Sequence, residues 1–166
     1  MSFAQGRTLD TSAEREARRT FAAVLKALGS RSRVAVALRR FGGSHEPRHD
    51  EDRLLDLWIA MEALFSPDDT TEVSFRLSLN AANYVEVEGL TRRALFEWLR
   101  KGYALRSSIA HGRDPELKKH VRLHGGQIKS LAEAAEELGE VVRIALLRYL
   151  FEPGPPDFTA LALGTG

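Results

Sequence analysis

Apolar residues recur at steps of three and four along most of the chain, which is the spacing of one face of an α-helix. This pattern predicts helices over residues 11–28, 32–41, 53–65, 92–110 and 127–151. Glycine follows the first two of these segments, and Pro153 follows the last, as expected where helices end. Trp58 and Trp98 fall on apolar arcs, so we expect both to lie in the core.

Residues 72–80 fit two patterns. Val73, Phe75, Leu77 and Leu79 alternate with polar residues, which is the periodicity of a strand. The sequence offers no second strand as a partner, and a lone strand leaves its backbone hydrogen bonds unmade. A helix over 71–87 is therefore predicted. The result is an all-α bundle of five or six helices in one domain, residues 1–152, followed by a flexible tail over 153–166.

Two charged residues lie inside the apolar arcs of predicted helices. At about 100° per residue, Glu62 falls on the apolar face of the 53–65 helix, and Arg106 on that of the 92–110 helix. An unpaired buried charge is too costly to keep. We therefore expect the two helices to pack and Arg106 to pair with Glu62, since a guanidinium can hold one carboxylate and still offer donors elsewhere.

His111 follows Arg106 by five residues, where Gly112 should end the helix. On an unbroken helix this separation turns the two side chains about 140° apart. An arginine can hold a phosphate and a histidine can move a proton, but these two do not share one helix face. A site built from them would lie at the helix end, and a second subunit could bring two such ends together.

Composition narrows the classes of function. The chain has 166 residues, 43% hydrophobic, with a formal net charge of +1, so any contact with RNA must be local rather than bulk-electrostatic. There are no cysteines, which excludes disulfides and thiolate metal sites. His45 with His49, and His120 with His124, have a spacing seen in metal sites but fall in predicted loops without a third ligand, so no metal site is expected. No apolar run is long enough to cross a bilayer, and a cytoplasmic protein without a membrane partner is expected.

The stretch Leu-Arg-Ser-Ser-Ile-Ala-His-Gly over residues 105–112 resembles the Arg-x4-His motif of HEPN domains, and most closely their ApeA-like branch. Two further segments, residues 37–41 and 52–65, are similar to the same branch and occur in the same order. The similarity covers roughly residues 20–151. The upstream Ala-Met-Glu-Ala-Leu-Phe segment and the glycine after the histidine make the pattern more specific than Arg-x4-His alone.

This resemblance implies an all-α homodimer that acts as a metal-independent endoribonuclease without a cofactor. His111 would be the general base on a ribose 2′-hydroxyl, and Arg106 would neutralise the phosphate. Ser107 stands where many members carry Asn, Asp or His and can still hydrogen-bond, while Glu62 would hold Arg106 in place. Four cations that follow the motif could guide RNA to the cleft or simply face solvent: Arg113, Lys118, Lys119 and Arg122.

Related domains also serve as toxins or antiphage defence components, which implies an antitoxin or a sensor domain as a further partner. Others are non-catalytic modules that bind RNA or dimerise, and this remains the alternative reading of the chain. A third reading of Arg106 and His111 is a purely structural network at a helix end.

Overall fold

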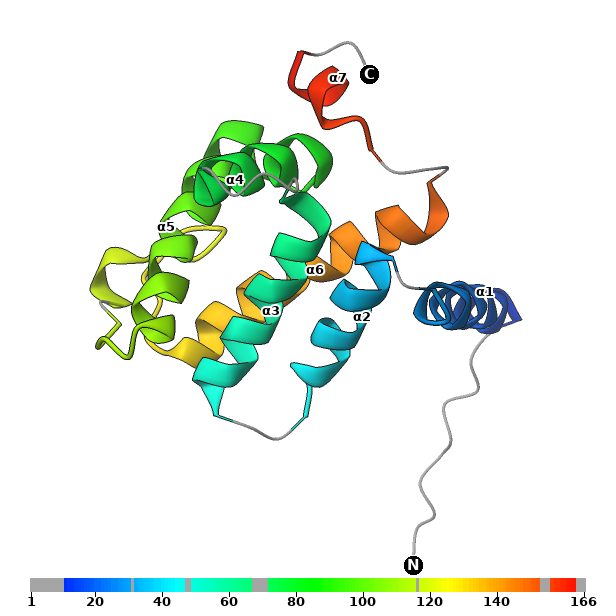
Figure 1. Ribbon diagram of the computed structural model, residues 1–166, viewed down its shortest axis with the longest axis horizontal. Helices are drawn as coiled ribbons and strands as arrows, with labels where there is room; N and C mark the ends of the chain where they lie inside the picture. The colour runs from blue at the N-terminus through cyan, green and yellow to red at the C-terminus, as the bar shows by residue number, and fades with distance from the viewer. Residues whose placement is uncertain are drawn as a thin grey trace, which may run out of the picture.

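The computed structural model describes residues 11–30, 32–46, 49–66, 72–115, 117–152 and 156–163. The regular elements in this part of the chain are all helices, as Figure 1 shows, which confirms the predicted all-α class. Its elements are α1 (Thr11–Leu28), α2 (Arg33–Gly43), α3 (Asp50–Phe65), α4 (Val73–Tyr84), α5 (Arg92–Ala110), the short 3₁₀ helix η1 (Leu117–Lys119), α6 (Leu131–Phe151) and α7 (Phe158–Leu163). None of the helices in these ranges is long and apolar enough to cross a membrane.

Helix α3 is the centre of the bundle and packs against α2, α4, α5 and α6 (Figure 1). The apolar arc predicted for it is buried as expected, with every member at most 2% exposed: Leu54, Leu57, Trp58, Met61, Leu64 and Phe65. Burial of large side chains on several sides explains why α3 has a broad apolar face rather than a narrow stripe. The positions of its neighbours are therefore set by contacts with α3.

The ambiguous segment 72–80 is part of α4, as predicted. Leu77 and Ala81 are fully buried one turn apart, and the Ser78 hydroxyl donates to the carbonyl of Ser74 within the same helix. The helix ends at Tyr84, three residues before the predicted end. The alternating apolar residues at its start therefore belong to a helix. They do not all face the core, since Phe75 is 42% exposed.

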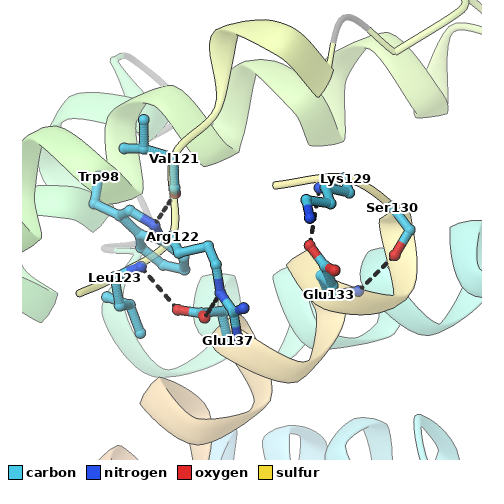
Figure 2. Close-up of polar contacts among 8 residues, drawn as sticks. All are labelled: Trp98, Val121, Arg122, Leu123, Lys129, Ser130, Glu133 and Glu137. Atoms are coloured by element: carbon cyan, nitrogen blue, oxygen red, sulfur yellow. Dashed lines mark hydrogen bonds and ion pairs between the residues drawn. The ribbon is translucent and has the colours of Figure 1, made fainter. Parts of the chain in front are cut away.

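Two helix starts differ from the predicted ones. Helix α3 begins at Asp50 rather than residue 53. Its first turn carries three acidic side chains, whose negative charges stabilise the positive end of the helix dipole. Helix α6 begins at Leu131 rather than residue 127. The Ser130 hydroxyl accepts from the Glu133 backbone N–H at 3.2 Å, and the Glu133 carboxylate accepts from the backbone N–H of Lys129 at 2.9 Å (Figure 2). This reciprocal arrangement is a variant of the capping box.

The two ends of the described chain also differ from expectation. Helix α1 lies at the edge of the bundle, and none of its residues is buried; Phe21 and Leu25 of its predicted apolar stripe are 64% and 54% exposed (Figure 1). The tail beyond residue 152 was expected to be loosely held, but it contains α7, which contacts α4. The Phe158 ring lies 5.9 Å from that of Phe65, so an aromatic contact joins α7 to the core.

Candidate functional site

A glycine brings α5 close to α3. A methyl group at Gly102 would lie 2.9 Å from Cζ2 of Trp58, which is closer than packed carbon atoms approach. Trp58 is 1% exposed, as expected for a core residue. One helical turn beyond this contact, α3 carries Glu62 and α5 carries Arg106. The close approach of the two backbones therefore allows these side chains to meet.

Arg106 and Glu62 form the predicted ion pair. Nη2 of Arg106 lies 3.1 Å from Oε1 of Glu62, and the two side chains are 27% and 24% exposed. The pair is thus partly screened from solvent without being sealed in the core. A pair in this position orients its guanidinium more firmly than two mobile surface side chains would.

Tyr103 completes this network, and sequence reasoning did not identify it. Its hydroxyl donates to the same Oε1 of Glu62 at 2.9 Å, and the guanidinium carbon of Arg106 lies 5.5 Å from the centre of its ring. Burial, followed by the hydrogen bond to Glu62 and the charge of that carboxylate, raises the pKa of Tyr103 to about 12. The phenol therefore stays protonated at neutral pH and remains a donor. The available signal was its spacing, because a residue three positions before Arg106 shares its side of the helix.

The guanidinium of Arg106 keeps hydrogen-bonding capacity beyond Glu62. Arginine has five N–H donors, and Glu62 lies against one of its terminal nitrogens. Among the described residues, the buried Nε–H of Arg106 has no hydrogen-bond partner. An anion arriving from solvent does not reach this buried Nε, but the Arg106 side chain as a whole is 27% exposed, so an anion such as a phosphate would be held by its terminal nitrogens.

His111 lies at the C-terminal end of α5, where backbone hydrogen bonds turn the chain. The N–H of Gly112 donates to the carbonyl of Ile109, and that of Arg113 donates to the carbonyl of Ser108, each at 2.9 Å. With Gly112 at φ 64°, this is a Schellman motif. His111 itself is exposed. Arg106 thus faces α3 while His111 lies at the open end of the helix, in line with the predicted separation of their directions.

Ser107 lies next to Arg106 on α5 and is partly buried. Its carbonyl accepts a hydrogen bond from the backbone N–H of His111 at 3.2 Å, which continues the helix to that residue. Ser107 therefore connects the two motif residues through the backbone. Its hydroxyl is the group that would assist the arginine in the predicted site.

Hydrogen bonds attach the segment over residues 121–123, between the motif and α6, to both α5 and α6 (Figure 2). The indole N–H of Trp98 donates to the carbonyl of Val121 at 2.8 Å. Trp98 is only partly buried and packs against the core from its edge, rather than lying inside it as expected. Glu137 accepts from Nε of Arg122 at 2.9 Å and from the backbone N–H of Leu123 at 2.8 Å. These hydrogen bonds therefore fix the segment beside the first half of α5 and the first turns of α6.

The predicted RNA-binding cations are in different environments. Arg113 and Lys119 are exposed, whereas the Arg122 guanidinium pairs with Glu137 and its side chain is 48% exposed. The side chain of Lys118 lies outside the described residues. His120 is 8% exposed, and its pKa is lowered by burial and then by the charges of Lys101 and Lys119. Positive charge therefore lies at the end of α5, from Arg113, and farther back along that helix, from Lys119 near Lys101, while Arg122 also has a structural role.

The arrangement offers an anchored guanidinium and an exposed imidazole on one helix. The first suits the binding of an anionic group, and the second can take up or release a proton. In the part of the chain that the structure describes, no three His, Asp or Glu side chains are close enough together to hold a metal ion. No protein-family model, curated protein or solved structure matches the chain.

Proposed function

We propose that the chain is a HEPN-type domain that cleaves RNA without a metal ion, as a homodimer, in a cleft formed where two copies of the α5 end meet. The observation that carries the proposal is the Arg106 guanidinium, held by Glu62 and Tyr103 on a side chain that is still 27% exposed, about one and a half turns from an exposed His111. A fixed cation beside a mobile proton carrier is the pair that phosphodiester cleavage by an internal nucleophile requires.

In the proposed reaction, the imidazole of His111 takes the proton from a ribose 2′-hydroxyl. The 2′-oxygen then attacks the adjacent phosphorus, the bond to the 5′-oxygen breaks, and that oxygen takes up a proton from water. The products are a 2′,3′-cyclic phosphate and a free 5′-hydroxyl. Arg106 neutralises the charge that accumulates on the phosphate oxygens, and Ser107 hydrogen-bonds beside it. No redox step or metal ion is needed for this balance.

The two motif side chains point in different directions from one helix, and this favours a cleft that two chains share. Arg106 of one copy would hold the phosphate, and His111 of the other copy would take the proton from the 2′-hydroxyl whose oxygen attacks that phosphate. The exposed Arg113 lies at the same helix end, and the exposed Lys119 lies near His120 and Lys101 farther back along α5; both would guide the RNA backbone towards the cleft. In a toxin or a defence protein, an antitoxin or sensor domain would control access to this cleft.

Cleavage of labelled RNA in EDTA tests the proposal. His111→Ala should lower the rate by about 10²- to 10⁴-fold, the usual contribution of a general base. Arg106→Ala should lower it comparably, and His124→Ala, which removes another exposed histidine, should leave it unchanged. An RNA with a 2′-deoxyribose at the cleaved position should resist the wild-type protein. Equal rates of cleavage by the wild type and both motif variants would refute the proposed ribonuclease activity. Absence of cleavage by any of them across varied RNAs would refute it as well.

Mixing the two inactive variants tests the shared cleft. If Arg106 and His111 act from different chains, a dimer of Arg106→Ala with His111→Ala has one intact cleft and regains part of the activity. If both act from the same chain, the mixture stays inactive. A chain that remains monomeric by light scattering while cleaving RNA would contradict the dimer.

The alternative is a non-catalytic module that binds RNA or dimerises. The observation that favours it is the pairing of Arg106 with Glu62 and Tyr103, which would also suit a purely structural arginine. RNA binding by wild type without any cleavage, weakened in Arg106→Lys, would support this module instead.

A further inference from the structure

An exposed aromatic surface lies beside the Arg106 site, between α4 and α5. The Phe75 and Phe96 rings meet edge to face, with their centres 5.6 Å apart. The guanidinium carbon of Arg100 lies 5.9 Å from the centre of each ring. Phe75 is 42% exposed, and Arg100 is exposed. We call Phe75, Phe96 and Arg100 the aromatic platform.

An open hollow joins the platform to the candidate site. It is open to solvent, and its lining includes Phe75, Arg100 and Tyr103. Tyr103 is the residue that also donates to Glu62 and stacks with Arg106. Since Arg100 precedes Arg106 by six residues, the two lie about 9 Å apart along the helix axis and about 120° apart around it, with Tyr103 between them in angle. A ligand that extends across Tyr103 would therefore reach both groups.

The chemistry of the hollow favours a planar, uncharged group. Exposed phenylalanine rings and an arginine plane are the surfaces on which unpaired nucleobases stack, whatever their sequence. Glu72 also lines the hollow, and its negative charge offsets the attraction of Arg100 for a phosphate there. A strand with its phosphate on Arg106 would thus place a base, rather than its backbone, against the platform.

We propose that the aromatic platform binds a nucleobase of single-stranded RNA, next to the phosphate held by Arg106. This inference rests on the proposed function, because it takes the same RNA as its ligand. It adds a requirement that the cleavage chemistry lacks: the nucleotide beside the cleaved bond must be unpaired, since a base within a duplex cannot stack on a protein surface. Duplex RNA should accordingly be a poor substrate.

The binding of a fluorescein-labelled short oligouridylate by the His111→Ala chain tests this site, because that chain binds without cutting. Phe75→Leu keeps an apolar contact with Phe96 but removes the stacking ring, and should weaken binding about tenfold. Phe75→Trp should restore the affinity. Phe21→Leu is the matched control, since Phe21 is a still more exposed ring on the remote helix α1, and should leave binding unchanged.

Oligouridylates with a single abasic position locate the stacked base. Scanning that position should reveal one place where loss of the base weakens binding to the His111→Ala chain, and Phe75→Leu should abolish that difference. Binding that is equal for Phe75→Leu and Phe21→Leu would overturn the platform while leaving cleavage by the wild type intact. Absence of both RNA binding and cleavage would instead overturn the proposed function and this inference with it.

Discussion

The contact between Gly102 and Trp58 predicts that one methyl group displaces α5. In Gly102→Ala, the new carbon would lie 2.9 Å from Cζ2 and 3.4 Å from Cη2 of an indole that is 1% exposed. Overpacking of this kind costs about 1–3 kcal/mol. Alanine in a helix interior recovers up to about 1 kcal/mol relative to glycine. The net effect on the free energy of unfolding is a loss of about 0–2 kcal/mol.

Gly139→Ala is the matched control, because Gly139 is also inside a helix and also faces α3. Its added methyl group would meet Cδ1 of Leu57 at 3.9 Å, an ordinary contact. Only the gain in helix propensity remains, so this variant should be more stable by about 1 kcal/mol. The propensity gains cancel between the two variants, which leaves the overpacking cost of about 1–3 kcal/mol as their difference.

Thermal unfolding followed by circular dichroism measures this difference. For a chain of this size, 1 kcal/mol shifts Tm by about 2–4 °C, so Gly102→Ala should melt about 2–12 °C below Gly139→Ala. Gly102→Ala should also cleave RNA more slowly, since α5 carries Arg106 away from its partner on α3. If the two alanine variants melt together, the indole gives way freely, and close packing at Gly102 does not hold α5 in place.

Two further predictions concern the tyrosines and the Glu62 carboxylate. The pKa of all three tyrosines is raised, to about 12 for Tyr84 and Tyr103 and in the same direction for Tyr149, with burial as the first cause in each case. Their stabilising contribution is therefore complete below pH 10 and is lost as the pH rises towards 12; tyrosinate absorbance near pH 10 in the folded protein would contradict this. Glu62→Gln should lower the free energy of urea unfolding by about 1–3 kcal/mol, because the half-screened Arg106 loses its counter-charge. Unchanged unfolding would mean that the ion pair contributes no stability.

Local geometry explains why the pair at the centre of the site could be predicted. The angular position of a residue on a helix depends only on its place in the sequence, so Glu62 and Arg106 stand out as charges on apolar faces. The presence of two such charges of opposite sign then predicts their contact. The bounds of α5 were also predicted correctly, because Thr91 and Gly112 mark its two ends.

Contacts between distant segments explain what the sequence did not show. The spacing of Tyr103 places it on the same side of α5 as Arg106, but only the packing of α3 against α5 shows that its hydroxyl meets Glu62. The start of α6 was predicted too early, because Ile128 continues the apolar spacing of Leu131 and Ala135. Ile128 lies in the loop before α6, and its side chain is buried. The apolar stripe of α1 was predicted from its spacing, but spacing alone does not tell which part of a stripe other helices cover.

Because of the Schellman motif at the end of α5, substitutions of His111 and of Arg106 differ in how directly they report on catalysis. Backbone groups of Ser108, Ile109, Gly112 and Arg113 form that turn, so removal of the His111 side chain takes away an imidazole and leaves the turn intact. Removal of the Arg106 side chain instead leaves a carboxylate and a phenol without their cation. A loss of activity in His111→Ala can therefore be attributed to lost proton transfer, whereas the same loss in Arg106→Ala combines chemistry with a local collapse of structure.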